Sequence, residues 1–358
     1  MKVVSSKVLN LRKPTQQLLL ATMSTLLFVQ LLCYGQTAAP TTRQPPPPGQ
    51  LVELGGYRLH LWCTGKGSPT VVLSPGSGDF SFDWALVQPS IAKVTRVCSY
   101  DRAGEAWSDL GPIPRTQTQE AFDLRRALVK ARVRGPYILV GHSAGGPLVR
   151  LFAADYKADV VGMVLVDGSH EEDTGNINGK MTTAFALSKG RPIPAPRASV
   201  AAADGLDDNA IKKIRAMVAK YDFMQPKIEP PYDKLPADVQ QLQLWAVGPP
   251  KHWAATSNDY GGEEAERLYQ IDHKTAHPLG AIPLVVLSQD MSQRTDEHAK
   301  IHIRTQQAMA QYSERGQQIV VAGAGHHIQL ERPEVVIDAI KQVLAAARHS
   351  TNKHGSQE

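Results

Sequence analysis

A serine between glycines is the strongest chemical feature of this sequence. Residues 137–140 (YILV) are typical of a short buried strand, residues 141–145 (GHSAG) follow at once, and residues 147–156 have a helical pattern. Because glycine has no Cβ, the two flanking glycines allow a sharp turn that lifts the Ser143 hydroxyl clear of the sheet. The helix that follows offers free N–H groups and the positive end of its dipole, which stabilise negative charge. Strand, G-x-S-x-G and helix together indicate a nucleophilic serine.

A nucleophilic serine needs a base that accepts its proton, an acid that orients the base, and donors for an oxyanion. In this arrangement the chain order is serine, acid, histidine. The base is therefore expected after the last strand pattern, where residues 323–333 read GAGHHIQLERP. We predict His326 as the base, with His327 as the second candidate. The alternative is that both are surface histidines, but a Gly-Ala-Gly lead-in directly after a buried strand disfavours it.

Two aspartates compete for the role of the acid. Asp290 ends the strand pattern at 282–287, and Asp167 ends the preceding strand pattern at 160–166. Asp290 stands where this arrangement usually has its acid, and Asp167 stands at a known alternative position, so both candidates stay open. Asp296 is a remote third choice. Asp167 has an alternative structural role, which is to cap the start of the segment that follows it.

The oxyanion donors are expected from two places. One is the N–H of Ala144, the residue after the nucleophile, and the other is the loop after the strand at 70–73. That loop is glycine-rich (SPGSGD), and we predict Ser77 as the second donor, with Gly78 next. The loop lacks a following Lys-Ser/Thr pair, which argues against a phosphate-binding loop.

The elements that must position these residues alternate between strand and helix at a spacing typical of a parallel sheet. The predicted strands are 51–55, 57–63, 70–73, 95–100, 137–140, 160–166, 282–287 and 318–321, and the predicted helices are 84–92, 116–133, 147–156, 296–313 and 333–348. Thr116 and Gln119 form a possible capping box at the start of one helix.

The alternation breaks at residues 168–280. This segment has no buried strand signal, but has helical pieces at 210–221, 236–245 and 263–269, which predict an inserted helical lid. The core is then expected at 51–167 and 281–348, and the tail at 349–358 is expected to be disordered. Three large residues of the insertion are hypothesised to line an acyl pocket or, alternatively, to pack the lid: Met224, Trp245 and Trp253.

Residues 1–39 differ in composition from the rest. Four basic residues precede an uncharged, leucine-rich run at 16–33, and small polar residues follow, which predicts a secretory signal peptide or an uncleaved N-terminal anchor. Residues 40–50 are proline-rich and read as an extended linker. We therefore expect an exported protein, periplasmic or secreted, with any membrane association confined to the N-terminal segment.

The remaining composition is that of an ordinary globular protein of 358 residues, with 42% hydrophobic and 20% charged residues. The net charge of +5 is not gathered into a basic stripe with aromatics, which argues against nucleic-acid binding.

His298 and His302 are four residues apart on a predicted helix, but no third ligand is evident near them. A solvated helix face is the simpler interpretation, so neither a metal nor a cofactor is expected.

Taken together, these segments resemble the α/β-hydrolase superfamily. The resemblance rests on VVL at 71–73 with Gly76 and Trp84, on RVCSYDRAG at 96–104, on GHSAGG at 141–146, and on GH…QLERP at 325–333, and it covers residues 51–348. It departs from the family pattern at Ser74-Pro75, where a histidine is usual. Asp290 also stands about two residues early, which keeps Asp167 in contention.

The resemblance implies an α/β fold with a mostly parallel eight-stranded sheet, flanking helices, an inserted lid and a Ser-His-acid site. It also implies that the second strand lies beside the fourth, which would bring Cys63 near Cys98 for a disulfide in an oxidising compartment. The implied activity is hydrolysis of an ester through an acyl-enzyme. Amide or peptide hydrolysis and acyl transfer are alternatives on the same triad, and a non-catalytic binding or signalling protein is an alternative of another class.

Overall fold

The computed structural model describes residues 44–177, 180–201, 204–256 and 264–354. The predicted signal or anchor segment at 1–39 lies outside the described residues. The proline-rich stretch is described from Gln44, and the first strand begins at Gln50. No helix in the described ranges has the length and apolar character that a membrane span needs.

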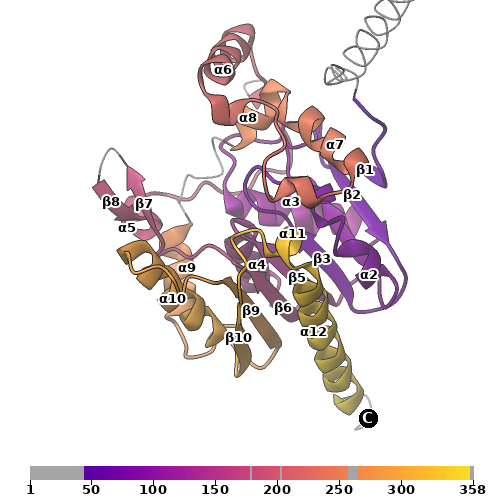
Figure 1. Ribbon diagram of the computed structural model, residues 1–358. Coiled ribbons are helices and arrows are strands. Elements are labelled where there is room, and N and C mark those ends of the chain that lie inside the picture. Colours follow the sequence, from indigo (N-terminus) through magenta and orange to yellow (C-terminus); the bar gives the residue numbers. More distant parts are fainter. Residues whose placement is uncertain (1–43, 178–179, 202–203, 257–263, 355–358) are drawn as a thin grey trace, which may run out of the picture. The chain divides into compact units, whose positions relative to one another are not determined.

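One eight-stranded sheet forms the centre of the protein (Figure 1). Its strands are β1 (Gln50–Glu53), β2 (Arg58–Thr64), β3 (Thr70–Ser74), β4 (Val97–Tyr100), β5 (Tyr137–His142), β6 (Val160–Val166), β9 (Pro283–Gln289) and β10 (Arg315–Val321), in the order β1-β2-β4-β3-β5-β6-β9-β10. β2 is antiparallel to both of its neighbours, and the pairs from β4 to β10 are parallel. The predicted fold class, with a mostly parallel eight-stranded sheet between helices, is confirmed.

Helices cover both faces of the sheet because the central strands are apolar on both sides. In β3, Val72 packs into one core and its neighbours Val71 and Leu73 into the other. The first core contains residues of α3 (Gln117–Lys130), α4 (Gly145–Asp155), α9 (Ala265–Asp272) and α10 (Glu297–Ala310). The second contains residues of α2 (Gln88–Ala92), α11 (Ile328–Glu331) and α12 (Pro333–His354).

The insertion (residues 168–280) lies between β6 and β9. Its helices are α5 (Ala184–Ser188), α6 (Asp208–Lys220), α7 (Ala237–Val247), α8 (Pro250–Thr256) and α9, with short 3₁₀ turns η4 (Asp222–Met224) and η5 (Tyr232–Lys234). The predicted helical pieces correspond to α6, α7 and α9. The structure also has an antiparallel pair in the insertion, β7 (Thr174–Ile177) with β8 (Lys180–Thr183). The sequence has no buried-strand pattern here, because neither strand belongs to the main sheet.

Two predicted helices have different limits in the structure. The helix predicted at 84–92 is divided into η1 (Ser81–Trp84) and the shorter α2, which begins beside Pro89. α12 continues to His354, so residues 349–354 are helical where disorder was expected. The reason is contact: the Ser350 hydroxyl donates to the carbonyl of Ala346 and accepts from Arg315.

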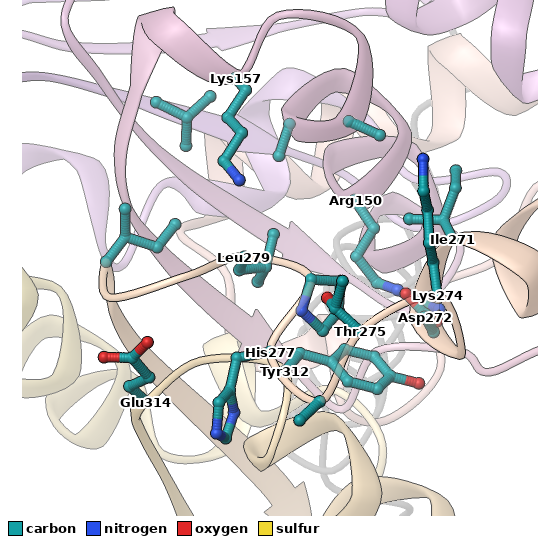
Figure 2. Close-up of a pocket in the computed structure, with 16 residues that line it drawn as sticks. Arg150, Lys157, Ile271, Asp272, Lys274, Thr275, His277, Leu279, Tyr312 and Glu314 are labelled. Atoms are coloured by element: carbon teal, nitrogen blue, oxygen red, sulfur yellow. Dashed lines mark hydrogen bonds and ion pairs between the residues drawn. The ribbon is translucent and has the colours of Figure 1, made fainter.

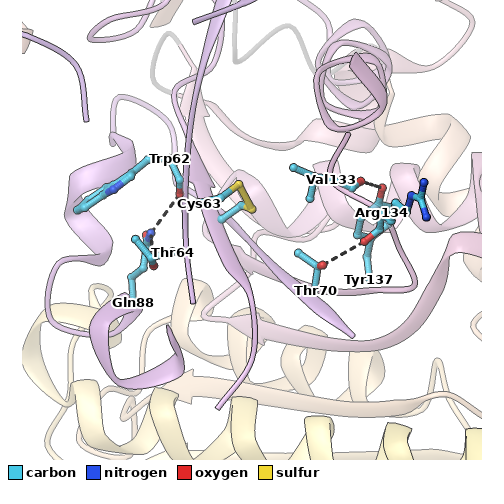
Figure 3. The surroundings of a disulfide bond; sticks show 9 residues. Trp62, Cys63, Thr64, Thr70, Gln88, Val133, Arg134 and Tyr137 are labelled. Atoms are coloured by element: carbon cyan, nitrogen blue, oxygen red, sulfur yellow. Dashed lines mark hydrogen bonds between the residues drawn. A yellow bond between two sulfur atoms is a disulfide. The ribbon is translucent and has the colours of Figure 1, made fainter. Parts of the chain in front are cut away.

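A disulfide joins Cys63 of β2 to Cys98 of β4 (Figure 3), as the resemblance implied. The two cysteines are direct partners in the antiparallel β2–β4 register. Close by, the Gln88 side chain donates to the carbonyl of Trp62. The bond therefore links β2, which is antiparallel to its neighbours, covalently to β4, which lies beside β3.

Candidate active site

The turn that carries Ser143 joins β5 to α4. Ser143 has a φ of +49°, in the left-handed region that costs energy for any residue except glycine. Gly141 and Gly145 make this turn possible, because a Cβ on Gly141 would lie 2.4 Å from the carbonyl oxygen of Gly145. A Cβ on Gly145 would in turn lie 2.6 Å from the carbonyl oxygen of Ser74. The predicted strand, turn and helix are therefore all present around the serine.

The loop after β3 packs directly against this turn. A Cβ on Gly76 would lie 3.1 Å from the Cβ of Ser143, so only a glycine lets the two segments approach so closely. The buried guanidinium of Arg102 donates to the carbonyls of Pro75 and Gly76, at 2.9 Å and 2.5 Å. In the sequence Arg102 is only one residue of a longer motif, and its role in holding this loop emerges from the structure.

The predicted oxyanion donors lie at these two segments. Ala144 is the N-cap of α4, directly after Ser143. Ser77 and Gly78 follow Gly76 in the loop, and Gly78 has a φ of +73°. The structure thus brings the turn and the loop together, which is the arrangement that an oxyanion hole requires.

His326 lies in the loop between β10 and α11, and its ring is half-exposed. Its Nδ1 donates to Oδ2 of Asp167 at 2.6 Å. Its ring centroid is 4.8 Å from that of His142, the residue next to Ser143. In the described part of the chain no hydrogen bond joins His326 to the Ser143 hydroxyl, and such bonds commonly tighten only when substrate is bound.

Asp167 is almost completely buried, and its two oxygens accept four hydrogen bonds. Oδ1 accepts from the Gln289 main chain at 2.8 Å and from Nε2 of His302 at 3.0 Å. Oδ2 accepts from the Gln289 side chain at 2.8 Å and from His326. Sequence reasoning missed His302 as a partner of this carboxylate. Its spacing from His298 suggests only a possible pair of metal ligands, and nothing in the sequence connects it with Asp167.

The other two candidate acids point elsewhere. Asp290 accepts from the main-chain N–H groups of Ser292 and Gly323, at 3.0 Å and 3.1 Å. Asp296 caps the start of α10 and pairs with Arg294. Neither carboxylate has a hydrogen bond to His326 among the described residues.

The pKa values of the pair reflect their mutual contact. Burial alone would raise the pKa of Asp167, but the hydrogen bonds and charges of His302 and His326 hold it well below its usual range. Burial alone would lower the pKa of His326, but the hydrogen bond and charge of Asp167 raise it above 6.5. Asp167 is therefore ionised at neutral pH and stabilises the imidazolium form of His326.

His327 belongs to a different group of side chains. Its Nε2 lies 2.9 Å from the hydroxyl of Tyr232, which donates to Oδ1 of Asp79 at 2.6 Å. Burial lowers the pKa of His327 to about 4, so its ring is neutral at pH 7. His142, expected to pack under the turn, is buried there with Nδ1 2.9 Å from Oδ2 of Asp79 and Nε2 3.1 Å from the carbonyl of His326.

The insertion is fixed to the core near the loop after β3 by several polar contacts. Nδ1 of His252 lies 2.5 Å from Oε2 of Glu105, and both side chains are buried. Nζ of Lys251 donates to the carbonyl of Ala106 at 2.7 Å. The ring centroids of Trp245 and Trp107 lie 5.2 Å apart in a small aromatic cluster. Trp245 therefore packs the insertion, which is the alternative to lining an acyl pocket.

A cavity of about 700 Å³ lies away from these residues (Figure 2). Residues of α4, of the loop 274–282 and of the segment before β10 line it, and Ser143, Asp167 and His326 are not among them. Arg150 at its edge binds Asp272 and, at 2.9 Å, Glu171. This cavity is therefore separate from the chemistry around Ser143.

Among the residues that the structure describes, two groups of side chains place three donors within 4.8 Å of one another, as a metal site would require. They are Asp79, His142 and His327, and His170, Glu171 and Asp272. In the first group Tyr232 and the main chain of His326 already bind the donor atoms. In the second group the Arg150 guanidinium, a cation, binds both carboxylates.

Comparison with solved structures shows the fold. An epoxide hydrolase, CorEH, covers 83% of this chain and 98% of its own length, with a TM-score of 0.58 and 20% identity. A thermophilic esterase from Thermogutta terrifontis covers 83% of this chain and 99% of its own, with a TM-score of 0.58 and 22% identity.

Most of the curated relatives described here match only about a third of this chain. A probable transporter of Hormonema carpetanum is 35% identical over 129 residues, which are 34% of this chain and 18% of the relative. An uncharacterised vacuolar membrane protein of Saccharomyces cerevisiae is 34% identical over 134 residues, 32% of this chain and 21% of the relative. The chain thus spans about a fifth of the length of these relatives. An AB hydrolase superfamily protein of Gibberella zeae is 22% identical over 78% of this chain and 87% of its own length.

The family model described as the alpha/beta hydrolase family matches residues 71–339, which include β3, the Ser143 turn, Asp167 and the His326 loop. The chain therefore belongs to the alpha/beta hydrolase family.

Proposed function

We propose that this protein is a serine hydrolase that cleaves carboxylic esters through an acyl-enzyme, with Ser143 as nucleophile, His326 as base and Asp167 as acid. The observation that carries the proposal is the short contact between Nδ1 of His326 and Oδ2 of Asp167, at 2.6 Å. The His326 ring lies 4.8 Å from that of His142, which directly precedes the left-handed Ser143. This geometry favours Asp167 over Asp290 as the acid.

In the proposed mechanism, Nε2 of His326 accepts the proton of the Ser143 hydroxyl as Oγ forms a bond to the ester carbonyl carbon. The oxyanion receives hydrogen bonds from the N–H of Ala144 and from the loop at Ser77 and Gly78. His326 then gives its proton to the leaving alcohol as the ester C–O bond breaks. Water, activated by the same imidazole, releases the acid and restores the serine. Asp167 stabilises the imidazolium in both halves.

The substrate class is proposed to be a small to medium, partly apolar ester. The esterase among the similar structures supports this class, and the serine at position 143 disfavours epoxide opening, which uses an aspartate at that place in the fold. Amide hydrolysis or acyl transfer uses the same three residues and is the second candidate. The triad contacts support an enzyme over a purely binding protein, which would not need them.

A fluorophosphonate probe tests the proposal directly. We expect the wild-type protein to be labelled and Ser143→Ala to give no labelling at equal folded concentration. A wild type that is not labelled and does not hydrolyse p-nitrophenyl esters of increasing chain length would favour the binding protein instead. The same ester series, set against matched anilides, separates an esterase from an amidase.

We further infer that the protein is exported. The N-terminal segment has the composition of a signal peptide or anchor, and a disulfide persists best in an oxidising compartment. Fractionation of the producing cells, with N-terminal sequencing of the protein, tests this inference. Recovery of the protein in the cytoplasm with Met1 intact would contradict it.

A further inference from the structure

The Asp167 carboxylate binds two imidazoles, although the proposed reaction uses one. His326 occupies Oδ2, and His302 of α10 occupies Oδ1 at 3.0 Å. With the two donors of Gln289, each carboxylate oxygen accepts two hydrogen bonds. Hydrogen bonds from neighbouring donors determine how strongly a carboxylate stabilises a positive charge beside it. The hydrogen bond from His302 therefore changes how strongly Asp167 stabilises the imidazolium of His326.

We propose that His302 is a positioning residue of the triad, which holds the Asp167 carboxylate in place and limits the basicity of His326 through the carboxylate that the two histidines share. This inference rests on the proposed function, because it assigns His326 as the base.

The surroundings of His302 fit this role. Its side chain is buried, and its Nε2 lies 3.0 Å from Oδ1 of Asp167, which is buried as well. The charged or titratable groups around it come from several elements: Asp167 after β6, Asp173 at the start of the insertion, His326 after β10, Asp290 after β9 and His298 one turn earlier on α10. A positive charge on His302 would thus act on Asp167, Asp173 and His326.

His302 also has its own route to solvent protons. It lines a cavity of about 130 Å³ together with Ser288, Asp290 and Gln318, which is large enough for water. Within the described residues, Nδ1 of His302 makes no hydrogen bond, so the ring can take up a second proton there. Burial alone lowers the pKa of His302, but Asp167 and Asp173 raise it above 6.5, while the charge of His326 opposes this rise. A positive charge on one imidazole therefore disfavours a positive charge on the other, although both bind the same carboxylate.

The sign of the effect is the same in either protonation state of His302. A neutral His302 withdraws charge from Asp167 by donating a hydrogen bond, and a protonated one also repels the His326 imidazolium. Removal of His302 should therefore raise the pKa of His326. A role confined to packing would leave that pKa where it is.

The experiment compares three variants by NMR titration of the His326 ring in the resting protein, which needs no substrate. His302→Gln keeps a donor to Asp167 but cannot be charged, and His302→Leu removes both donor and charge. We expect the pKa of His326 to rise by about half a unit or more in His302→Leu, and by less in His302→Gln, which keeps the hydrogen bond to Asp167. His298→Gln, on the same helix but without a bond to Asp167, should leave it unchanged.

Kinetics give the second readout. The acid limb of kcat/KM should move to higher pH in His302→Leu, and less far in His302→Gln. His302→Leu should also lose kcat by about tenfold, since the carboxylate loses one of its charge-assisted donors, whereas His302→Gln should retain most of it. If His302→Leu does not fold, His302→Phe takes its place, because it keeps a ring in the same space but has neither donor nor charge.

The proposal is overturned if His326 titrates at the same pH in the wild type and in a folded His302 variant that lacks a side-chain donor. An absence of fluorophosphonate labelling in the wild type would instead contradict the proposed function. The titration could still show the coupling in that case, so the two failures are distinguishable.

Discussion

Oδ2 of Asp167 lies 2.6 Å from Nδ1 of His326, although 159 residues separate them in the chain. The contact forms because β6 and β10 end at the same edge of one sheet, with β9 between them. Asp167 itself has a φ of +45°, so the chain leaves β6 through a constrained turn that aims the carboxylate at the histidine. Most of the proposed chemistry depends on this pair.

The first prediction separates the two candidate acids. Asp167→Asn should lower kcat by roughly 10³- to 10⁴-fold, because the imidazolium loses its counter-charge and the imidazole its orientation. Asp290→Asn should change kcat by about twofold at most, since its carboxylate binds only local N–H groups. Steady-state kinetics on one ester checks both variants. The reverse ranking would assign the acid to Asp290.

The second prediction concerns pH. His326 must be neutral to accept the serine proton, and Asp167 raises its pKa above 6.5. The value of kcat/KM should therefore fall as the pH is lowered through a pKa above 6.5. A pH profile of kcat/KM checks this, and an acid limb below 6.5 would contradict the contact between His326 and an ionised Asp167.

The third prediction tests how closely the loop after β3 approaches the nucleophile. Gly76→Ala would place a methyl group 2.6 Å from Oδ2 of Asp79 and 3.1 Å from the Cβ of Ser143. The loop must then move, and we expect kcat to fall by about 10²-fold. Gly248→Ala is a matched control, because its Cβ would meet other atoms at no less than 3.5 Å. Equal activities of the two variants would refute the close approach.

The fourth prediction concerns the disulfide. Replacing Cys63 and Cys98 by serine should lower the free energy of unfolding by about 2–4 kcal/mol, since the bond closes a loop with a sequence separation of 35 residues. Urea unfolding of the oxidised protein and the double variant measures the difference. The rate of fluorophosphonate labelling per folded molecule should stay the same. An unchanged free energy of unfolding would contradict the prediction and show that the pairing of β2 with β4 does not depend on the bond.

The fifth prediction concerns acid stability. His170 is buried, its Nδ1 accepts from the N–H of Glu172 at 3.0 Å, and burial first of all lowers its pKa to about 4. Below pH 6.5 the unfolded chain binds a proton there that the folded protein does not. The free energy of unfolding should therefore fall as the pH drops from about 6.5 to about 4, by about 3 kcal/mol at most for this residue.

His170→Gln provides the control for this effect. Glutamine does not titrate, so the variant should show a shallower loss of stability over the same pH window. Urea unfolding at several pH values measures it. An identical slope in both proteins would mean that another group, such as the neutral His327, accounts for the loss.

The sequence by itself determined the local features of this protein. The glycines around Ser143, the apolar strand before it and the helix after it act over a few residues, so the turn could be predicted from them. The alternation of strands and helices likewise predicted the parallel sheet, and the lead-in to His326 placed a loop after the last strand. These features depend on backbone conformation and on which side chains are apolar, and both can be read along the chain.

Only the tertiary structure shows that Asp167, and not Asp290, contacts His326. Both follow a buried strand, and only the direction in which each chain leaves the sheet brings one carboxylate to His326 and turns the other to the main chain of Ser292. The same holds for His302, which reaches Asp167 across 135 residues. A sequence pattern carries the type and spacing of residues, whereas contacts between distant segments depend on how strands and helices pack.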